Sequence, residues 1–314
     1  MSNSASQKKN ILITCAGGGG PIFLARELGK SHNVFLVDGG DQNAGPHLGF
    51  PFQKIPFGNS PEFSKAIKNL VEKWKIDCLV PGADEELLPV AKILEENPKL
   101  MGTVPSADFI SLCLNKKRLM EELSKDGISN LLGFKEKKDV VYPAIIKPIF
   151  GRGSRQFHII KNADEMEGYL KLYGEKFEDV LCQPYIEGVE YTVSVIVNNK
   201  NKLIGIVPKR IIEKRGITRS AVSEYSQIIN DVSRAIVEKY NPKGLFNIQL
   251  KIFKGVVYIF EINPRLSTTS VLTDKSFGNE VELYMKYYDE ETIINPPKLK
   301  EKIFLYRYDE NIFV

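Results

Sequence analysis

The sequence predicts an α/β domain with a parallel sheet, followed by an α+β region built on antiparallel strands. Over residues 10–100, apolar strand-like runs alternate with amphipathic helical runs, which is the pattern of a parallel sheet with helices on its faces. Further on, the strand-like runs 245–253 and 256–263 are separated by too few residues for a crossover connection, so they form an antiparallel hairpin. The 314 residues are 43% hydrophobic, enough for two or three domains with cores.

The first domain consists of strand and helix in alternation. Its glycine-rich stretches fall where strands end, and ligands of open parallel sheets bind at the carboxyl ends of the strands. We expect strands at 11–16, 33–38 and 76–82, helices at 21–30, 61–74 and 84–97, and ligand-facing turns at 16–20, 37–45 and 80–86.

One of these turns invites a dinucleotide interpretation. Residues 16–20 read AGGGG, and Asp38 ends the next strand, where a ribose-binding acid would lie. The spacing is not G-x-G-x-x-G, because Phe23 and Leu24 occupy the region of the third glycine. A tight strand–helix turn facing a ligand cleft is favoured over a nicotinamide site, which remains an alternative.

The second region begins near residue 106 with a helix that Ser106 can cap. A glycine-rich turn between two strands follows, and then further strands and helices. The expected helices are 106–128, 162–173, 223–242 and 280–288, and the expected strands include 179–186, 190–197 and 202–214.

Composition excludes several classes of protein. A net charge of +4 is too small and diffuse to indicate nucleic-acid binding. The sequence contains no run of about 18 apolar residues, so we expect no membrane span. Residues 1–10 are polar, unlike a secretory signal. Four cysteines lie far apart without a CxxC pair, which predicts buried thiols in a cytoplasmic protein rather than zinc or disulfides.

The stretch KPIFGRGSRQ, residues 147–156, has the composition of an anion-binding turn. Gly151 and Gly153 allow the backbone to direct N–H groups toward an anion. Lys147 lies four residues before the first glycine and can reach the same phosphate. A surface hairpin with an unrelated lysine is the alternative.

The strand at 256–263 ends in groups that a core strand does not need. Glu261 and Asn263 share one face because side chains alternate along a strand. Carboxylate and amide oxygens suit Mg²⁺, and Arg265, just past Pro264, suits phosphate. The paired strand adds Gln249 as a further oxygen donor.

The hairpin register decides whether Gln249 belongs to this set. Opposed residues of a hairpin have a constant index sum, so Gln249 faces Glu261 only if the loop is odd in length or the strand contains a bulge. We predict a three-residue loop around Gly255, or a bulge. A regular two-residue turn would place Gln249 on the wrong face.

Three stretches together resemble the ATP-grasp superfamily and, within it, carbamoyl-phosphate-synthase-like proteins. They are YPAIIKPIFGRGSRQ, QPYIEGVEYTVSVIV and NIQLKIF with VVYIFEINPRLSTTSVLTDKSFG. The resemblance implies a pre-ATP-grasp domain at residues 1–105, a lid-bearing ATP-grasp lobe at 106–180, and a metal-binding lobe with the C-terminal tail at 181–314.

The resemblance also implies roles for individual residues. The nucleotide ATP would contact Lys116, Lys147, Gly151, Arg152, Gly153, Ser154, Gln183, Tyr185, Ile186, Glu190 and Lys209. Mg²⁺, as two ions and with Mn²⁺ as a possible substitute, would be held by Gln249, Glu261 and Asn263. Lys147, Arg265 and Arg210 would act on the reacting groups.

The family reaction activates a carboxylate as an acyl phosphate, and an amine then displaces phosphate. The resemblance therefore implies a cytoplasmic carboxylate–amine ligase that acts on small molecules and suggests a homodimer. Alternatives are a carbamoyl or acyl phosphate-forming enzyme of the synthase type and a non-catalytic ATP-binding regulatory protein.

The substrate-binding residues are the least defined. Arg210, with Arg215 or Arg219, can bind a carboxylate bidentately, or the basic stretch 209–223 is simply solvated. Asp84 or Glu85 can hold an amine, or stabilise the start of their helix through its dipole.

Overall fold

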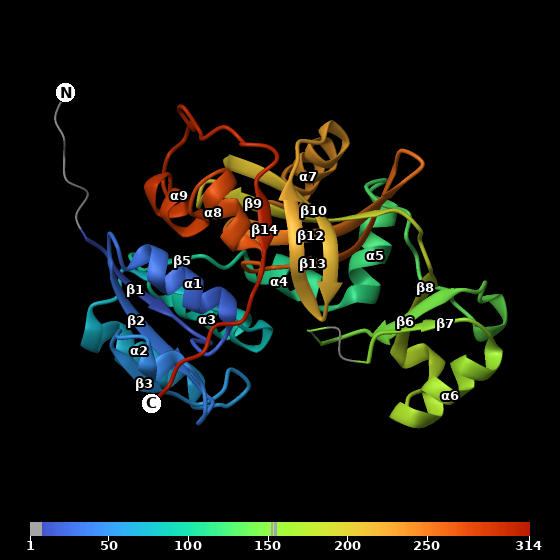
Figure 1. The fold of residues 1–314 in the computed structure, drawn as a ribbon, viewed down its shortest axis with the longest axis horizontal. Helices are drawn as coiled ribbons and strands as arrows, with labels where there is room; N and C mark the ends of the chain where they lie inside the picture. Colours follow the sequence, from blue (N-terminus) through green and yellow to red (C-terminus); the bar gives the residue numbers. More distant parts are fainter. Residues whose placement is uncertain (1–7, 152, 154–155) are drawn as a thin grey trace.

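The computed structural model describes residues 8–151, 153 and 156–314. Its described strands form three sheets, and each sheet belongs to a different part of the molecule (Figure 1). Arg152, Ser154 and Arg155, from the predicted phosphate loop, lie outside the described residues.

The N-terminal part is a five-stranded parallel sheet in the order β3-β2-β1-β4-β5. Two hydrophobic clusters lie on its two faces, which explains the continuous apolar character of its strands. The strands are β1 (Asn10–Ile13), β2 (Asn33–Asp38), β3 (Phe52–Lys54), β4 (Cys78–Val80) and β5 (Met101–Gly102), and the helices are α1 (Gly19–Leu28), η1 (Gly45–His47), α2 (Phe63–Trp74) and α3 (Asp84–Glu96). The parallel sheet predicted from sequence is confirmed.

The stretch expected to be helical at 106–128 contains two helices instead of one continuous helix. The segment forms α4 (Ala107–Leu114) and α5 (Lys116–Lys125), separated at Asn115. Asn115 has an extended backbone, and its side-chain oxygen accepts a hydrogen bond from the Arg118 N–H at 3.0 Å. An asparagine that caps a new helix competes with continuation of the old one. The break makes Lys116 the first residue of α5.

A small three-stranded antiparallel sheet, in the order β7-β6-β8, carries the glycine-rich turn. Its strands are β6 (Ala144–Pro148), β7 (His158–Ile160) and β8 (Val180–Pro184), with α6 (Ala163–Tyr173), η2 (Lys137–Asp139) and η3 (Phe177–Asp179) beside them. This lobe projects from the rest of the molecule in Figure 1. Because β8 belongs to it, the small sheet continues past the predicted lobe boundary at residue 180.

The largest sheet has six strands in the order β13-β12-β9-β10-β11-β14, and all its pairs are antiparallel. The strands are β9 (Val189–Val197), β10 (Leu203–Arg215), β11 (Ile217–Ser223), β12 (Leu245–Phe253), β13 (Val256–Asn263) and β14 (Phe304–Tyr306). The remaining helices are α7 (Gln227–Tyr240), α8 (Ser270–Ser276) and α9 (Glu280–Lys286).

One face of this sheet is covered by helices, which leaves part of the other face for a site. Apolar side chains of α4, α5 and α7 pack with Val193, Ile248 and Ile259 in one core cluster. Residues 107–125 therefore pack on the large sheet, although the sequence placed them in the lid-bearing lobe. By strand alternation, Thr192, Gln249 and Glu261 face the opposite side.

The C-terminal segment returns to the N-terminal part of the molecule. After β14 it runs alongside the parallel-sheet region (Figure 1). Arg307 donates to the Thr268 carbonyl at 2.7 Å, and Arg26 of α1 pairs with Glu310 at 2.6 Å.

Two predictions about composition can be compared with the structure. Cys78, Cys113 and Cys182 are buried, free thiols as predicted, whereas Cys15 is only partly buried. None of the helices in the described ranges is both long and apolar enough to cross a membrane.

Candidate functional site

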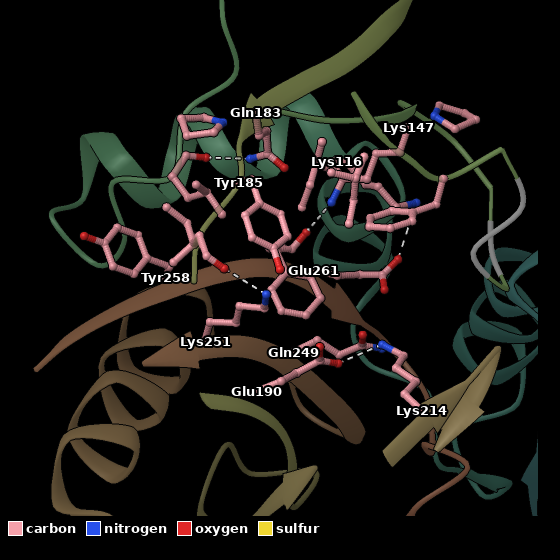
Figure 2. A pocket seen from close by; sticks show the side chains of 18 of the residues that line it. Lys116, Lys147, Gln183, Tyr185, Glu190, Lys214, Gln249, Lys251, Tyr258 and Glu261 are labelled. Carbon is pink, nitrogen blue, oxygen red and sulfur yellow. Dashed lines mark hydrogen bonds and ion pairs between the residues drawn. The ribbon is translucent and has the colours of Figure 1, made fainter. Parts of the chain in front are cut away.

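A cavity of about 390 Å³ lies between the small sheet and the open face of the large sheet. Figure 2 shows Lys116 and Lys147 entering from one side and Glu190, Gln249 and Lys251 from the other. The lining residues used below are Lys116, Lys147, Gly151, Gln183, Tyr185, Ile186, Glu190, Lys214, Gln249, Lys251, Tyr258, Phe260 and Glu261.

A bulge in β13 brings Gln249 and Glu261 together. Residues 254 and 255 form a two-residue turn between Phe253 and Val256, so the expected three-residue loop is wrong. The register then shifts by one residue between Gln249 and Leu250: Leu250 pairs with Ile259, but Gln249 pairs with Glu261. Phe260 is the extra residue. The bulge, which was the other predicted possibility, thus places Gln249 opposite Glu261.

The bulge also changes which side chains reach the cavity. Before it, Tyr258 lines the cavity and Ile259 lies in the core; after it, Glu261 lines the cavity and Ile262 lies in the core. Two consecutive residues, Phe260 and Glu261, therefore both face the cavity. A regular ladder would have turned the Glu261 carboxylate into the apolar core.

Lys116 connects this strand to the glycine-rich turn. Its ammonium group donates to the Gly151 carbonyl at 2.6 Å and lies 3.6 Å from a Glu261 carboxylate oxygen. Gly151 has φ +116° and Gly153 has φ +70°, backbone conformations that favour glycine. The helix break at Asn115 therefore positions a cation between the turn and the acid.

Lys147 is a second, deeply buried cation in the same cavity. It donates to the carbonyl of the bulge residue Phe260 at 2.9 Å. Burial lowers the pKa of Lys147 to about 8, the Glu261 carboxylate opposes that shift, and the positive charges of Lys116 and Lys214 add to it. Among the residues that the structure describes, no carboxylate forms an ion pair with Lys147, so this buried ammonium group can take an anion as its partner.

The opposite end of the cavity is more apolar. Lys251 donates to the Ile186 carbonyl at 2.8 Å and lies over the Tyr185 ring, 4.8 Å from its centroid. The Tyr185 N–H donates a hydrogen bond to the Pro143 carbonyl at 3.2 Å. Gln183 is buried, and its amide nitrogen donates to the Leu131 carbonyl at 2.7 Å.

Sequence analysis missed several cavity residues, among them Lys214, Lys251, Tyr258 and Phe260. Lys214 pairs with Glu190 at 2.8 Å. Lys251 could have been found, since it lies two residues after Gln249 on the same strand face. Lys214 and Phe260 could not, because register shifts in β10 and β13 place them.

Several of the predicted site residues do not line the larger cavity. Lys209 is 0% exposed and donates to the hydroxyls of Ser194 at 2.6 Å and Thr273 at 2.8 Å. Ser194 in turn donates to Glu280 at 2.8 Å, so Lys209 belongs to a buried polar cluster that fastens α8 and α9 to the sheet. Its placement against the nucleotide is corrected accordingly.

Arg210 also differs from its predicted role. It is adjacent to Lys209 in β10, so its side chain lies on the other face of the sheet. Its guanidinium binds Glu224 at 2.7 Å, and Glu224 accepts a second bond from the Tyr191 hydroxyl at 3.0 Å. Arg215 pairs with Glu213 and Arg219 with Asp309. The basic stretch is thus a set of ion pairs.

Arg265 lies beyond the end of β13, beside the N-terminal domain. Its Nε donates to Asp84 at 2.5 Å, and both side chains are largely buried. Arg265 lines a second cavity of about 70 Å³ together with Gly20 and Ser267. Asp84 therefore fixes an arginine and is not open to an amine, whereas Glu85 is exposed on the first turn of α3.

The metal prediction can be compared with the oxygen donors. Gln249 and Glu261 line the cavity, and Asn263 follows on the same face, buried and hydrogen-bonded to Asn247 at 3.4 Å. Within the described ranges no three His, Cys, Asp or Glu side chains cluster. One carboxylate with amide oxygens fits a cation that also takes phosphate and water oxygens, as Mg²⁺ does.

In the N-terminal domain, the Asp38 carboxylate is hydrogen-bonded to the glycine-rich turn. The two Asp38 carboxylate oxygens accept from the Gly17 N–H at 2.9 Å and the Gly40 N–H at 2.8 Å. Asp38 is thereby used within the strand–helix turn, which favours the structural interpretation over a dinucleotide site.

The sequence matches the family model for the ATP-grasp domain over residues 113–269, half of the chain. This range contains Lys116, Lys147 and the bulged hairpin. The chain belongs to the ATP-grasp family. Within an ATP-grasp domain, the helix break, the glycine-rich turn and the bulged strand line one shared cavity.

Curated relatives of this ATP-grasp chain include two carbamoyl phosphate synthase large chains. The protein from Clostridium beijerinckii is 27% identical over 241 residues, 69% of this chain and 22% of its own length. The protein from Methanoregula boonei is 26% identical over 200 residues, 60% of this chain and 19% of its own length. The chain thus spans about a fifth of the length of these relatives.

Solved structures share the ATP-grasp fold at low sequence identity. A biotin carboxylase–beta-gamma-ATP complex from Campylobacter jejuni has a TM-score of 0.71 at 17% identity, covering 95% of this chain and 75% of that one. The complex of N5-carboxyaminoimidazole synthetase from Staphylococcus aureus with ADP has a TM-score of 0.74 at 17% identity, covering 93% of this chain and 80% of that one. L-amino acid ligase from Bacillus licheniformis has a TM-score of 0.67 at 17% identity, covering 89% of this chain and 74% of that one.

Proposed function

We propose that this protein is an ATP-dependent ligase that activates a small-molecule carboxylate as an acyl phosphate and joins it to an amine. The observation that carries the proposal is the composition of the larger cavity. Two lysines, a glycine-rich turn and the Gln249–Glu261 pair lie at one end, and an apolar end is formed by Tyr185 and Ile186. This division matches a triphosphate and a purine base.

At the charged end the chain supplies positioning and charge, which is what phosphoryl transfer requires of a protein. Lys147 and Lys116 would bind phosphate oxygens, with Gly151 and Gly153 covering them. Gln249, Glu261 and Asn263 would hold Mg²⁺, and we propose two ions, with Mn²⁺ as a possible substitute. When bound, the metal neutralises phosphate charge.

The present hydrogen bonds of Lys116 and Lys147 can be exchanged for bonds to phosphate oxygens. Lys116 now bonds a loop carbonyl and an acid, and Lys147 bonds a strand carbonyl. Phosphate oxygens are stronger acceptors than carbonyls because they are charged. Glu190 would bind the ribose hydroxyls at the middle of the cavity, where Lys214 already orients it.

The acceptor end would lie toward Arg265. The Arg265–Asp84 pair joins the ligase domain to the N-terminal domain beside the smaller cavity. We propose that Arg265 contacts the transferring phosphate or the carboxylate being activated, with its side chain oriented by Asp84. The amine and carboxylate are small molecules, and a cytoplasmic homodimer is the proposed setting.

Release of ADP tests the proposal. Pairs of a carboxylate and an amine, amino acids first, are screened with Mg²⁺ and ATP. The expected result is ADP release that requires both members of a pair and is lost in Glu261→Gln. Equal release by the variant would contradict the assigned role of Glu261, and ATP binding without release for any pair favours a regulatory protein.

A second candidate is a carbamoyl or acyl phosphate-forming enzyme, favoured by the synthase relatives. It differs in the substrate that drives turnover. Release of ADP dependent on bicarbonate, without any organic carboxylate, would support this alternative over the ligase.

A further inference from the structure

The large antiparallel sheet ends at β14, and the outer edge of this strand is open. Among the described strands, β14 pairs only with β11. The Ile303 carbonyl accepts from the Ser223 N–H at 3.0 Å, and the Arg307 N–H donates to the Arg219 carbonyl at 2.8 Å. Inward and outward backbone groups alternate along an antiparallel strand. The residues whose backbone groups face the open edge are therefore Phe304, Tyr306 and Tyr308.

The side chains of these three residues are aromatic and exposed. Phe304, Tyr306 and Tyr308 are 52%, 72% and 81% exposed, and the first two rings stack with their centroids 6.2 Å apart. Natural proteins usually protect an open edge with charged side chains, proline or a bulge, and none of the three outward residues is charged or a proline. A row of exposed rings along an unpaired strand is typical of a surface that another chain covers.

The charges that flank this strand indicate which chain that is. Three exposed lysines precede it and two exposed acids follow it: Lys298, Lys300, Lys302, Asp309 and Glu310. Within the described ranges no carboxylate pairs with these lysines. Glu301, which lies among them, accepts a hydrogen bond from the Tyr225 N–H at 3.0 Å. A strand that is basic before and acidic after is complementary to itself when two copies run antiparallel, because each basic end then meets an acidic end.

We propose that two copies of this chain pair through β14, antiparallel, about a two-fold axis at Tyr306. In this register Tyr306 lies opposite Tyr306 of the second copy, and Phe304 lies opposite Tyr308. Each outward residue thus meets an outward residue and exchanges backbone hydrogen bonds with it. A shift of one residue would set outward groups against inward ones. The rings of both copies share one face and form cross-strand aromatic pairs.

The paired segment also connects the two ends of the molecule. Arg307, next to the axis, donates to the carbonyls of Thr268 at 2.7 Å and Thr218 at 3.1 Å, and Glu310 binds Arg26 of the N-terminal domain. Pairing through β14 would therefore order the segment that holds the N-terminal domain to the large sheet. This surface belongs to the homodimer proposed above and does not depend on the chemistry in the larger cavity.

The test is sedimentation equilibrium of the full chain, without nucleotide, over a range of concentrations. The wild type is expected to be a dimer at about 10 µM. Tyr306→Lys sets two like charges opposite each other at the axis and should raise the dissociation constant of the dimer at least about tenfold. Val141→Lys adds the same charge at an exposed apolar residue of the small lobe and, as the control, should leave the dissociation constant unchanged.

Disulfide cross-linking tests the register itself. Tyr306→Cys places two Cα atoms about 5.5 Å apart across the axis, within reach of a disulfide. Tyr308→Cys is more exposed, but it faces Phe304 of the second copy, about 13 Å along the strands from its own counterpart. On oxidation, Tyr306→Cys should form a covalent dimer, whereas Tyr308→Cys and the wild type should not.

Three results would overturn the proposal: a wild type that stays monomeric at about 100 µM, a dimer whose dissociation constant is unchanged in Tyr306→Lys, or equal cross-linking of the two cysteine variants. The cross-linking result does not require that Tyr306→Lys folds. A monomeric wild type that still binds MgATP would overturn this proposal and leave the proposed ligase standing, so the two can fail separately.

Discussion

Gln249 and Glu261 lie directly opposite each other across the β12–β13 hairpin, although the hairpin has a two-residue turn that should place Gln249 opposite residue 260. The bulge at Phe260 restores the pairing, and its carbonyl accepts from Lys147. One inserted residue thus positions an amide, a carboxylate and a lysine in a single cavity.

The two-residue turn between β12 and β13 can be tested through the free energy of unfolding. Lys254 and Gly255 both have positive φ, 49° and 76°, as in turns that match the strand twist. We expect Gly255→Ala to lower the free energy of unfolding by about 1 kcal/mol, because alanine disfavours this conformation. Denaturant unfolding measures the change.

Gly168, inside α6, is the matched control for this substitution. An added methyl group would meet open space at both glycines, but Gly168 does not have a positive φ. Gly168→Ala should raise the free energy of unfolding by about 0.5–1 kcal/mol. A change of the same sign at both positions would contradict the assignment of the cost to backbone strain at Gly255.

Lys147 predicts a pH dependence of nucleotide binding. With a pKa of about 8, caused mainly by burial, Lys147 is charged at neutral pH and loses its proton above pH 8. If the charged form binds phosphate, affinity for MgATP should fall about tenfold between pH 7 and 9. In Lys147→Met the affinity should be low and insensitive to pH over this range.

The effect of the same group on stability has the opposite sign. The folded chain holds this proton less tightly than the unfolded chain, where lysine titrates near 10.5, so the contribution of Lys147 to stability rises as pH increases from 8 toward 10.5. Weaker binding at pH 9 therefore cannot be ascribed to unfolding through Lys147. Affinity that stays constant to pH 9 would contradict its assigned role.

Lys209 should matter for stability and not for the nucleotide. Lys209→Met leaves Glu280, which is 3% exposed, without its buried cation. We expect a loss of about 3 kcal/mol in the free energy of unfolding, with unchanged MgATP affinity of the folded protein. Lys214→Met, on the same strand but in the cavity, should weaken MgATP binding with little loss of stability. Weaker MgATP binding with unchanged stability in Lys209→Met would contradict this assignment and place Lys209 at the nucleotide site.

Sequence analysis predicted the architecture because hydrophobic periodicity and chain connectivity are local signals. The parallel sheet at 10–102 and the hairpin at 245–263 follow from strand runs and the residues between them. The oxygen donors Gln249 and Glu261 were found because strand alternation and index sums can be read from residue numbers. The bulge was anticipated only as one of two possibilities, since turn geometry and core packing select between them.

The remaining differences depend on interactions distant in sequence. Lys209 and Arg210 are adjacent basic residues, and only the pairing of β10 with β9 shows that one faces buried hydroxyls and the other faces Glu224. The ion pair between Arg265 and Asp84 joins a residue just after β13 to the first residue of α3. Asn115 could have been recognised, because an asparagine between apolar and basic helical runs is a common N-cap.

The central claim is that Glu261 holds the metal at the phosphate end of an ATP site, and magnesium dependence of ATP affinity tests it most directly. Affinity is measured with and without Mg²⁺ for the wild type, Glu261→Gln and Glu190→Gln; both variants remove one carboxylate from the same cavity. We predict that Mg²⁺ strengthens ATP binding at least about tenfold in the wild type and Glu190→Gln, and has little effect in Glu261→Gln. Magnesium dependence that persists in Glu261→Gln, or is lost in both variants alike, would contradict the account.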